Sequence, residues 1–482
     1  MHEYDIVVIG AGPAGLLVAG DLAALGRSVA VVERRPTIDR RSRAFAVMPR
    51  TLEVLRQRHL SDAVVAVGHP QDRVHVPGGV RVDLSGLPTP FPYILVVPQY
   101  VVETELDRYA RQSGATVLRD HEVTGIELDR DGVQVQTSRR GESGPRLGAR
   151  YLVAADGAHS TVRSLLGLPF PGHTVIRSVI LADVVAEGAP DGLSIGVGGD
   201  AFTFLAPYGD GRRYRAMGWD RHRQPAEDEP VTDDELRRLL ERTRTDGVTI
   251  RTVEQAWRFR SDERQLRDYR QARVLFAGDA AHVHSPAGGQ GMNTGIQDAA
   301  NLAWKLDHVL AGAPTEVLDS YQRERHPVGR SVLRRSGAML RLFTLPDRIG
   351  GPARAAVGAA LRVPAVRRAV AAGLSGITVR YPGPGVVGRR AAMIPTAAGL
   401  MLDRQSDLHF VLVVPAGDDP GPTSEVRVLR RDDRGPAVLV RPDGYIAWAG
   451  TAADGTWRDE LARWSPPPRR QRATASAVHT GH

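Results

Sequence analysis

The sequence contains no cysteine. This absence excludes disulfide bonds, thiolate metal sites and cysteine nucleophiles, and it fits a protein of the reducing cytoplasm. Lysine is almost as scarce, because Lys305 is the only one and arginine supplies the rest of the positive charge. We therefore expect a cytoplasmic protein whose chemistry uses no thiol.

Long hydrophobic runs are also absent, since the longest apolar stretches have only the length of a strand. No membrane-spanning helix is therefore expected. The first residues, Met1 to Asp5, place no basic segment before an apolar one, so no export signal is expected either. The net charge of +8 could help attract an anionic nucleotide, although the arginine-rich composition of a GC-rich genome explains it more simply. The arginines are dispersed among acids without an aromatic stacking surface, which argues against nucleic-acid binding.

The N-terminal stretch has the pattern of a dinucleotide-binding strand, turn and helix. An apolar run, Ile6 to Ile9, predicts a buried parallel strand and leads into Gly10, Gly12 and Gly15. These glycines permit a tight turn, the approach of a pyrophosphate and close packing of the following helix, whose N-terminus attracts phosphate. A second apolar strand ends at Glu33, near the ~20-residue spacing expected for an acid that binds ribose. We prefer this interpretation to a glycine-rich surface turn.

Two further motifs combine a strand, an acid and a glycine. One strand ends at Asp156-Gly157 before a helix that carries Arg163, and another ends at Gly278-Asp279 before a glycine-rich loop, Gly288 to Gly291. A long helical pattern follows this loop. A helix cap is the simpler explanation for Asp279, and a surface arginine is the simpler explanation for Arg163. We nevertheless expect all three motifs to serve one cofactor.

The region between residues 173 and 267 reads as alternating strands interrupted by one polar helix, which predicts a separate sheet. The family resemblance described below implies that a large aromatic ligand would lie under this sheet. The candidate wall residues are Phe202, Phe204, Tyr214, Met217, Trp219 and Pro286. Because successive strand residues face opposite sides, we expect about half of the strand candidates to be ordinary core.

Together these motifs resemble those of the class A flavoprotein monooxygenases, which have the fold of p-hydroxybenzoate hydroxylase. Three stretches are similar to the aromatic polyketide hydroxylases of angucycline and anthracycline biosynthesis and to rifampicin monooxygenase: Pro49 to Val54, Pro98 to Leu106, and Gln290 to Thr294. Asp319 to Gly329 resembles the next helix of that family. Val440 to Trp448 resembles its C-terminal thioredoxin-like domain, which without cysteine cannot carry out dithiol chemistry.

The resemblance implies an α/β (α+β) fold, with a Rossmann-like FAD-binding domain, an inserted, mostly antiparallel substrate-binding sheet and a C-terminal thioredoxin-like domain. The implied limits are residues 1–75, 99–172 and 268–345 for the discontinuous FAD-binding domain, 76–98 and 173–267 for the substrate-binding sheet, 346–378 for a helical connection, 379–465 for the thioredoxin-like domain and 466–482 for a disordered tail.

The activity implied by the resemblance is aromatic hydroxylation. NADPH (or NADH) would reduce FAD, O2 would add at flavin C4a, and the hydroperoxide would oxygenate a polycyclic, polyketide-type ring in natural-product biosynthesis. No acid or base for a substrate phenol is evident in the sequence. The alternatives are a Baeyer–Villiger or epoxidising monooxygenase, a rifampicin-type antibiotic-modifying enzyme, an NAD-dependent dehydrogenase or a flavin-binding protein without activity. A homodimer is left open.

The resemblance also implies residue roles. Glu33 would bind the adenosine ribose, Asp279 would hold the ribityl chain, and a helix beginning at Asn293 would point its N-terminus at the flavin N1–C2=O edge. The backbone of Pro286, Gly289, Gly291 and Met292 would lie along the isoalloxazine. The full set of implied cofactor residues is Gly10, Gly12, Pro13, Ala14, Gly15, Glu33, Arg34, Arg43, Gln99, Val123, Asp156, Asp279, Pro286, Gly289, Gly291, Met292 and Asn293.

His282 and His284 raise the question of a metal or a general base. No carboxylate stands at ligand spacing from them in the sequence. We therefore expect two loop histidines and no metal.

Overall fold

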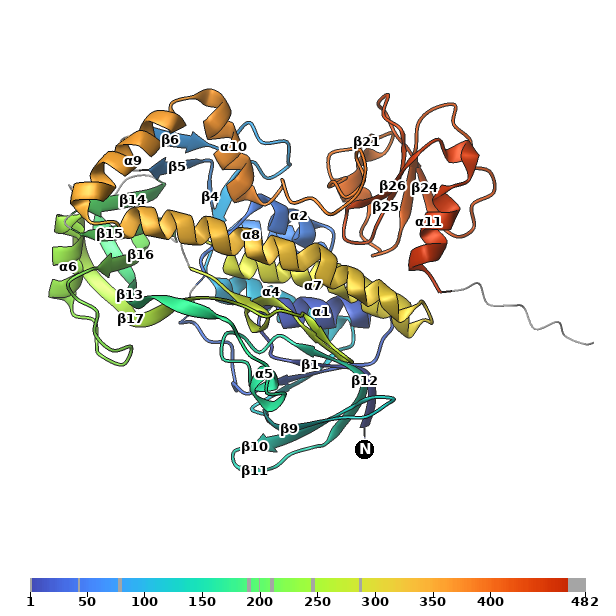
Figure 1. Ribbon diagram of the computed structural model, residues 1–482, viewed down its shortest axis with the longest axis horizontal. Helices are drawn as coiled ribbons and strands as arrows, with labels where there is room; N and C mark the ends of the chain where they lie inside the picture. Colours follow the sequence, from blue (N-terminus) through green and yellow to red (C-terminus); the bar gives the residue numbers. More distant parts are fainter. Residues whose placement is uncertain are drawn as a thin grey trace, which may run out of the picture.

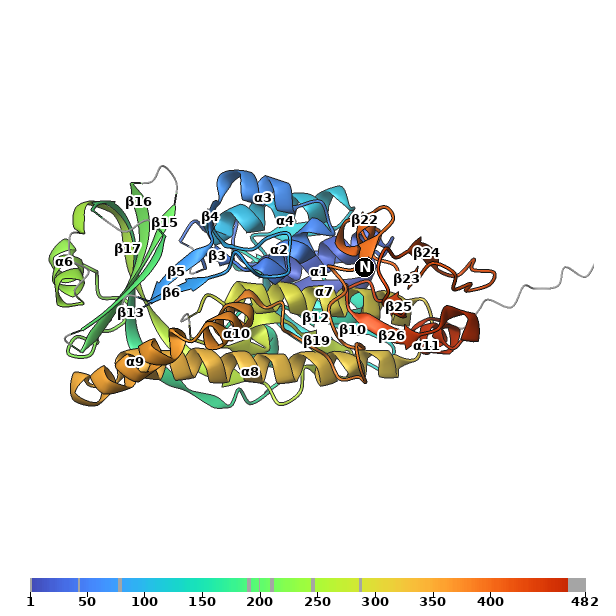
Figure 2. The ribbon, with the colours of Figure 1, turned by 90° about the horizontal axis from the view of Figure 1, so that it is seen from above.

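The computed structural model describes residues 2–466 except residues 42–43, 77–79, 189–191, 199, 209–211, 244–247 and 286–287. Arg43, Pro286 and residues 467–482 of the expected tail lie outside the described residues. The molecule contains two large sheets joined along one side by the long helix α8 (Asp319–Thr344), and a C-terminal unit lies at one end (Figures 1 and 2).

The larger sheet has nine strands among the described residues. Their bounds are β1 (His2–Ile9), β2 (Val29–Glu33), β8 (Thr116–Arg119), β9 (Glu122–Leu128), β10 (Val133–Arg139), β11 (Glu142–Ser143), β12 (Leu147–Ala154), β18 (Arg270–Gln271) and β19 (Val274–Phe276). The parallel core runs β19-β12-β1-β2-β8, and β10 continues it beside β12 in antiparallel orientation. Ile6 to Ile9 are at most 4% exposed, so this strand is apolar because both of its faces are covered.

Helices lie beside this sheet, mostly on one side of it (Figure 1). They are α1 (Pro13–Ala24), α2 (Pro49–Arg56), α3 (Ser61–Val67), α4 (Gln99–Gln112), α5 (Thr161–Leu165) and α7 (Gly291–Leu310). Helix α1 packs against both α4 and α7 and is buried along most of its length. The start of α7 is thereby fixed beside the start of α1.

The second sheet has eight strands and is mostly antiparallel. In spatial order it contains β20 (His282–Val283), β17 (Thr249–Gln265), β13 (Gly172–Glu187), β16 (Arg213–Asp220), β15 (Ala201–Tyr208), β14 (Leu193–Gly198), β5 (Arg73–Val76) and β6 (Val80–Asp83). Helix α6 (Asp233–Arg242), capped by the Thr232 hydroxyl, packs on one face of this sheet and buries Leu236, Leu239 and Leu240 there. The opposite face looks toward the nucleotide half.

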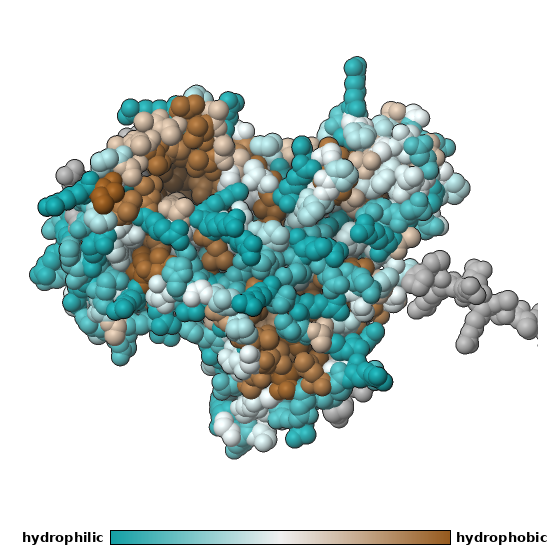
Figure 3. All heavy atoms as spheres, viewed as in Figure 1, coloured by the Kyte–Doolittle hydropathy of each residue, from teal (hydrophilic) through white to brown (hydrophobic). Residues whose placement is uncertain are grey.

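Smaller elements link the two sheets. A three-stranded sheet contains β3 (Ala46–Val47), β7 (Ile94–Val96) and β4 (His69–Gln71). After α8, helices α9 (Asp347–Leu361) and α10 (Pro364–Ser375) pack over β6. Apolar residues gather around a hollow on this face (Figure 3). Helices α9 and α10 and the turn between them carry exposed Ile349, Val357, Val363, Val366 and Val370.

The C-terminal unit is built on a four-stranded mixed sheet. Its strands are β24 (Arg427–Arg430), β23 (Val411–Val414), β25 (Ala437–Val440) and β26 (Ile446–Gly450), in that order, with α11 (Trp457–Trp464) packed beside β26. A short hairpin, β21 (Pro395–Thr396) and β22 (Gly399–Leu400), precedes them. Strands β23 and β24 are parallel, and the other pairs are antiparallel.

The α/β class is confirmed, but three expectations differ from the structure. Helix α7 begins at Gly291 rather than Asn293. Strand β5 lies in the second sheet although it falls almost wholly within residues 1–75, and β7 leaves that sheet for the small one. His282 and Val283 also pair with β17. The sheet that a short strand joins depends on its backbone pairing, and the apolar period of the sequence does not determine that pairing.

In the described part of the chain, no helix combines the length and apolar character that crossing a bilayer needs.

Candidate active site

The three predicted motifs meet at one edge of the nine-stranded sheet, where β1, β12 and β19 end. Gly10 has a φ of +100°, and a Cβ there would lie 2.4 Å from the carbonyl oxygen of Ala155 and 2.7 Å from the Cα of Asp156. A Cβ on Gly278 would lie 3.3 Å from the Cβ of Ala14. The carboxyl ends of parallel strands are the usual place for a ligand in such a sheet. Motifs separated by almost 270 residues therefore form a single site.

The first turn has the shape that a pyrophosphate requires. A Cβ on Gly15 would lie 2.0 Å from the carbonyl oxygen of Gly10, so α1 starts in direct contact with the turn. A Cβ on Gly12 would meet nothing within 4 Å, so the backbone there faces open space. Pro13 occupies the first turn of α1, where its missing N–H is not needed. The remaining N–H groups at this helix start are available to an anion.

Glu33, at the end of β2, faces this turn. Its Oε2 accepts a hydrogen bond of 2.7 Å from the N–H of Ala11, and its Oε1 accepts one of 2.9 Å from the N–H of Arg35. Each carboxylate oxygen has a further lone pair for a ribose hydroxyl. The neighbouring Arg34 is exposed. The acid therefore stands where an adenosine ribose would meet it.

Asp279 lies in the turn after β19, next to the start of α7 in space, and it is exposed. A Cβ on Gly291, the first residue of α7, would lie 3.9 Å from Oδ1 of Asp279. A Cβ on Gly295 would lie 3.2 Å from the Cα of Gly278, so the helix rests on the turn that carries Asp279. The first N–H groups of α7 lack partners within the helix and form its positive end.

Asn293 fixes the glycine-rich loop. Its Oδ1 accepts from the N–H of Met48 at 2.8 Å, and its Nδ2 donates to the carbonyl oxygens of Ala46 at 2.9 Å and Gly289 at 2.7 Å. Gly289 has a φ of +63°, and a Cβ on Gly288 would lie 3.0 Å from Cε of Met339. The side chain of Asn293 is thus fully used by the protein. Among the expected cofactor residues, Asn293 acts on the loop and only its backbone can serve a ligand.

The second motif joins the other two through buried polar contacts. Arg163 donates hydrogen bonds to the carbonyl oxygens of Ala280 at 3.1 Å and Ala158 at 2.6 Å, and its guanidinium lies 3.8 Å from the ring centroid of Phe170. It is therefore not a surface arginine. Burial raises the pKa of Asp156, whose Oδ1 has no hydrogen-bond partner in the described part of the chain.

Two other expected cofactor residues have local roles. Gln99 donates a 2.6 Å hydrogen bond from Nε2 to Oε1 of Glu103, and burial raises the pKa of Glu103 to about 7. The side chain of Val123 is buried in the main core, so only its backbone can meet a cofactor.

The aromatic candidates separate into two groups. Phe202 pairs with Trp219, and Phe204 with Met217, across β15 and β16, so these four share one face. Phe202 is 3% exposed and stacks on Trp219 with 5.8 Å between ring centroids. Both pack into a core cluster with Leu340 of α8, so they support the sheet rather than line a chamber.

Phe204 lies at the edge of that core and reaches toward β3. Its ring centroid is 5.4 Å from that of Phe45, and it touches both the core cluster under α8 and the one beside Met48. The expectation that Tyr214 lines the ligand site is wrong, because Tyr214 packs with α6 on the opposite face of the sheet. The strand period alone could not reveal which face is which.

A buried ion pair on the same inner face was missed from sequence. Arg215 binds Asp183 through two hydrogen bonds of 2.8 Å, and its guanidinium lies 5.6 Å from the ring of Trp257 and 6.0 Å from that of Phe45. Charged residues in an alternating strand normally mark the solvent face, so their presence here gave no signal.

His282 is not a free loop histidine. It is fully buried in β20, and its Nε2 lies 2.6 Å from Oδ2 of Asp298. Asp298 also accepts from Arg325 Nε at 2.6 Å and from the N–H of Gly278 at 3.2 Å. Burial alone would raise the pKa of Asp298, but Arg325 and His282 outweigh it and lower that pKa. Among the described residues, no group of three or more His, Cys, Asp or Glu side chains could hold a metal ion.

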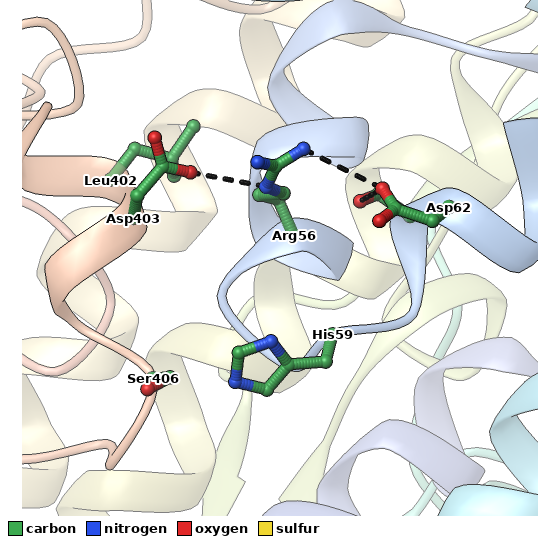
Figure 4. A pocket seen from close by; sticks show the side chains of 7 residues that line it. Arg56, His59, Asp62, Leu402, Asp403 and Ser406 are labelled. Carbon is green, nitrogen blue, oxygen red and sulfur yellow. Dashed lines mark hydrogen bonds and ion pairs between the residues drawn. The ribbon is translucent and has the colours of Figure 1, made fainter. Parts of the chain in front are cut away.

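A separate polar hollow of about 160 Å³ lies between the α2–α3 turn and the C-terminal unit (Figure 4). Arg56 spans it, because its Nε lies 3.0 Å from Oδ1 of Asp403 and its Nη1 lies 3.5 Å from Oδ1 of Asp62. The residues that line it are Arg56, His59, Ser61, Asp62, Leu402, Asp403 and Ser406. None of the three motifs contributes to it, so it is not part of the site above.

The residues at the sheet edge fit FAD. The open space at Gly12 suits the pyrophosphate, Glu33 suits one ribose, and the exposed carboxylate of Asp279 suits a hydroxylated chain. The start of α7 offers N–H groups that suit the isoalloxazine ring of FAD, because that ring gains negative charge on reduction.

Comparison with known proteins agrees with this geometry. The family described as "FAD binding domain" matches residues 3–336, and the family "Aromatic-ring hydroxylase, C-terminal" matches residues 389–468. The chain is similar to the solved structure of OxyS anhydrotetracycline hydroxylase from Streptomyces rimosus, with a TM-score of 0.83, 33% identity and coverage of 97% of this chain and 100% of that chain. It is also similar to CabE, an aromatic hydroxylase from angucycline biosynthesis, with a TM-score of 0.82, 33% identity and coverage of 97% and 100%.

A third relative is the rifampicin monooxygenase of Streptomyces venezuelae, which is 34% identical over 93% of this chain and 96% of its own length. The resemblance inferred from the motifs is thus confirmed. The chain belongs to the family of FAD-dependent aromatic-ring hydroxylases, and it is a flavin-dependent aromatic monooxygenase.

Proposed function

We propose that this monooxygenase takes electrons from NADPH and hydroxylates a polycyclic, polyketide-type phenol. The observation that supports this most is the meeting of three distant turns at one sheet edge, with Gly10 against Ala155 and Gly278 against Ala14. The relatives named above are an anhydrotetracycline hydroxylase, an aromatic hydroxylase from angucycline biosynthesis and a rifampicin monooxygenase, and their names support a substrate with several rings. When bound, FAD supplies the oxygen-transfer chemistry itself.

The residues of the chain bind and orient the reactants. Glu33 holds the adenosine ribose, the turn from Gly12 to Gly15 holds the pyrophosphate, and Asp279 holds the ribityl chain. The N-terminus of α7 would offer its free N–H groups and positive dipole to the flavin ring when FAD is bound. Asn293 keeps the loop from Gly288 to Gly291 in place because it bonds Gly289 of that loop as well as Ala46 and Met48.

The same loop connects the cofactor site to the aromatic face of the second sheet. Gly288 packs on Met339, and Gly289 packs on Met48, while Phe204 belongs to the core clusters of both methionines. A flat polycyclic ring would lie here against Phe204, Phe45 and Trp257, where it is shielded from water. The ion pair of Arg215 with Asp183 supplies polar groups on the same wall.

The cofactor placement is tested with Asp279→Ala. We expect the purified wild-type protein to be yellow or to become so with FAD, and Asp279→Ala to bind FAD at least about 10-fold more weakly because a charged hydrogen-bond acceptor is lost. Asp233→Ala, at an exposed first-turn position of α6, is the matched control and should bind FAD as the wild type does. Unchanged FAD affinity of Asp279→Ala contradicts the placement.

The reaction type is tested with tricyclic and tetracyclic phenols. NADPH consumption coupled to a product with one additional oxygen on an intact carbon skeleton supports hydroxylation. An ester inserted into a ring or an epoxide identifies the Baeyer–Villiger or epoxidising alternative instead.

A further inference from the structure

His284 lies beside Asp279 at the start of α7, and the roles proposed above do not use it. A Cβ on Gly291 would lie 3.6 Å from Cε1 of His284 and 3.9 Å from Oδ1 of Asp279. The imidazole of His284, the residue after β20, and the carboxylate of Asp279, in the turn after β19, therefore lie near the same point. Asp279 is exposed there, so the point is open to a ligand.

The hydrogen bonding of the ring assigns its tautomer. Nδ1 of His284 lies 3.3 Å from the carbonyl oxygen of Ser285, and a carbonyl can only accept, so Nδ1 carries the proton. Nε2 then presents a lone pair. This atom is buried and has no hydrogen-bond partner in the part of the chain that the structure describes. A buried acceptor of this kind normally has a donor.

Neighbouring groups hold the ring in this state. His284 stacks on His282, with 6.1 Å between ring centroids and 12° between ring planes. His282 is itself bonded to Asp298, which binds the N–H of Gly278. Burial, followed by His282, lowers the pKa of His284, while Asp279 and Asp298 act in the opposite sense with less effect. His284 is therefore neutral at neutral pH and keeps the lone pair on Nε2.

Two hydrogen-bond acceptors at one point select a particular part of a dinucleotide. Phosphate oxygens and flavin carbonyls only accept, so they cannot satisfy both Asp279 and Nε2 of His284. A hydroxylated carbon chain can, because adjacent hydroxyl groups each donate one hydrogen bond. Within FAD, the adenosine ribose and the ribityl chain have this chemistry, and because Glu33 is proposed to bind the ribose, the ribityl chain is the part left for Asp279 and His284.

We propose that Nε2 of His284 accepts a hydrogen bond from a ribityl hydroxyl of FAD, next to the hydroxyl that Asp279 binds. This inference rests on the proposed placement of FAD. His284 is a cofactor-binding residue that fixes the flavin at the start of α7, and the His282–Asp298 pair positions its ring.

The test is FAD affinity, measured by flavin fluorescence during titration of the full-length protein. His284→Phe keeps the ring volume without an acceptor, and we expect it to bind FAD about 2- to 12-fold more weakly, the range of one neutral hydrogen bond. His284→Gln returns an acceptor to the position of Nε2 and should bind within about 2-fold of the wild type. His409→Phe is the control, because His409 also bonds a nearby backbone carbonyl but is exposed in the C-terminal unit.

A flavin dinucleotide that lacks ribityl hydroxyls provides the second measurement, and His284→Leu, which also lacks an acceptor, replaces His284→Phe in both measurements if His284→Phe does not fold. This flavin should bind the wild type more weakly than FAD does, and His284→Phe should not weaken its binding further. Equal affinity of wild type and His284→Phe for FAD, or an equal effect of His284→Phe on both flavins, overturns the proposal and leaves water as the partner of Nε2. If the wild type binds no FAD at all, the proposed function fails first, and the two failures are thereby distinguished.

Discussion

The guanidinium of Arg441 binds the carboxylate of buried Glu324 through both oxygens, at 2.6 and 2.8 Å. Arg441 lies just after β25 in the C-terminal unit, and Glu324 lies in α8. Lys305 of α7 completes the group, with Nζ 2.8 Å from Oε2 of Glu324. Burial alone would raise the pKa of Glu324, but Arg441 and Lys305 outweigh it and lower that pKa. The C-terminal unit is thus joined by buried charges to α8 and to α7, whose start forms part of the candidate flavin site.

Glu324→Gln should destabilise the protein strongly. Removing this carboxylate from the buried ion group leaves Lys305 without its ion-pair partner and Arg441 with Asp443 alone, and such losses measure about 3–5 kcal/mol. Urea unfolding followed by circular dichroism gives the free energy of unfolding, with exposed Glu316→Gln as the control. A loss below about 1 kcal/mol would show that the group contributes little net stability.

Lys305 should resist amine modification in the folded protein. Its side chain is fully buried, it donates to Asn301 and Glu324, and burial lowers its pKa to about 8. We expect an acetylating reagent to leave the Lys305 peptide unmodified in buffer and to modify it fully in urea, as read by mass spectrometry. Equal rates of modification in both conditions would contradict the burial of this amine.

Glu103→Gln should change stability in a pH-dependent way. Burial raises the pKa of Glu103 from its ordinary value of 4.5 to about 7, so the folded protein holds this proton more tightly than the unfolded chain. The contribution of Glu103 to stability is therefore full below pH 4.5, falls as the pH rises to 7, and stays lost above it.

The variant has no such group to ionise. Relative to wild type, Glu103→Gln should gain about 2–3 kcal/mol of stability between pH 4.5 and pH 8, measured by urea unfolding at both values. A difference between variant and wild type that is the same at the two pH values would show that Glu103 ionises normally.

Phe202 and Phe204 should behave differently although they share a strand face. Phe202→Ala removes a ring stacked on Trp219 in the core and should lower the free energy of unfolding by about 3–5 kcal/mol. Phe204→Ala, at the edge near Phe45, should cost less stability and raise KM for the aromatic substrate about 10-fold. Thermal unfolding and steady-state kinetics separate the two effects. Equal KM values for Phe204→Ala and wild type would show that Phe204 does not contact the substrate.

The sequence was sufficient to predict the three strand–turn–helix motifs that meet at one sheet edge, because the constraints on each motif are local. Gly10, Gly12 and Gly15 each answer a backbone requirement of one turn, and Glu33 and Asp279 stand at strand ends, where parallel strands place them together. The order of strand, turn and helix could therefore be predicted from residues close in the chain.

The remaining features depend on contacts between segments far apart in the chain. Nothing near Tyr214 indicates that α6 covers its face, and nothing near His282 indicates that Asp298 of α7 will meet it. The pairs Arg215 with Asp183 and Arg441 with Glu324 are likewise read as surface charges when each strand or helix is considered alone. Buried ion pairs become visible only when the partner segment is known.

The most direct test of this account is a single turnover experiment under 18O2 with FAD, NADPH and a tetracyclic polyketide phenol, analysed by mass spectrometry of the product. We expect a hydroxylated product that carries one 18O atom, formed as NADPH is consumed. Consumption of NADPH with hydrogen peroxide as the only oxygen product for every polycyclic phenol, or a product whose new oxygen comes from water, would contradict it.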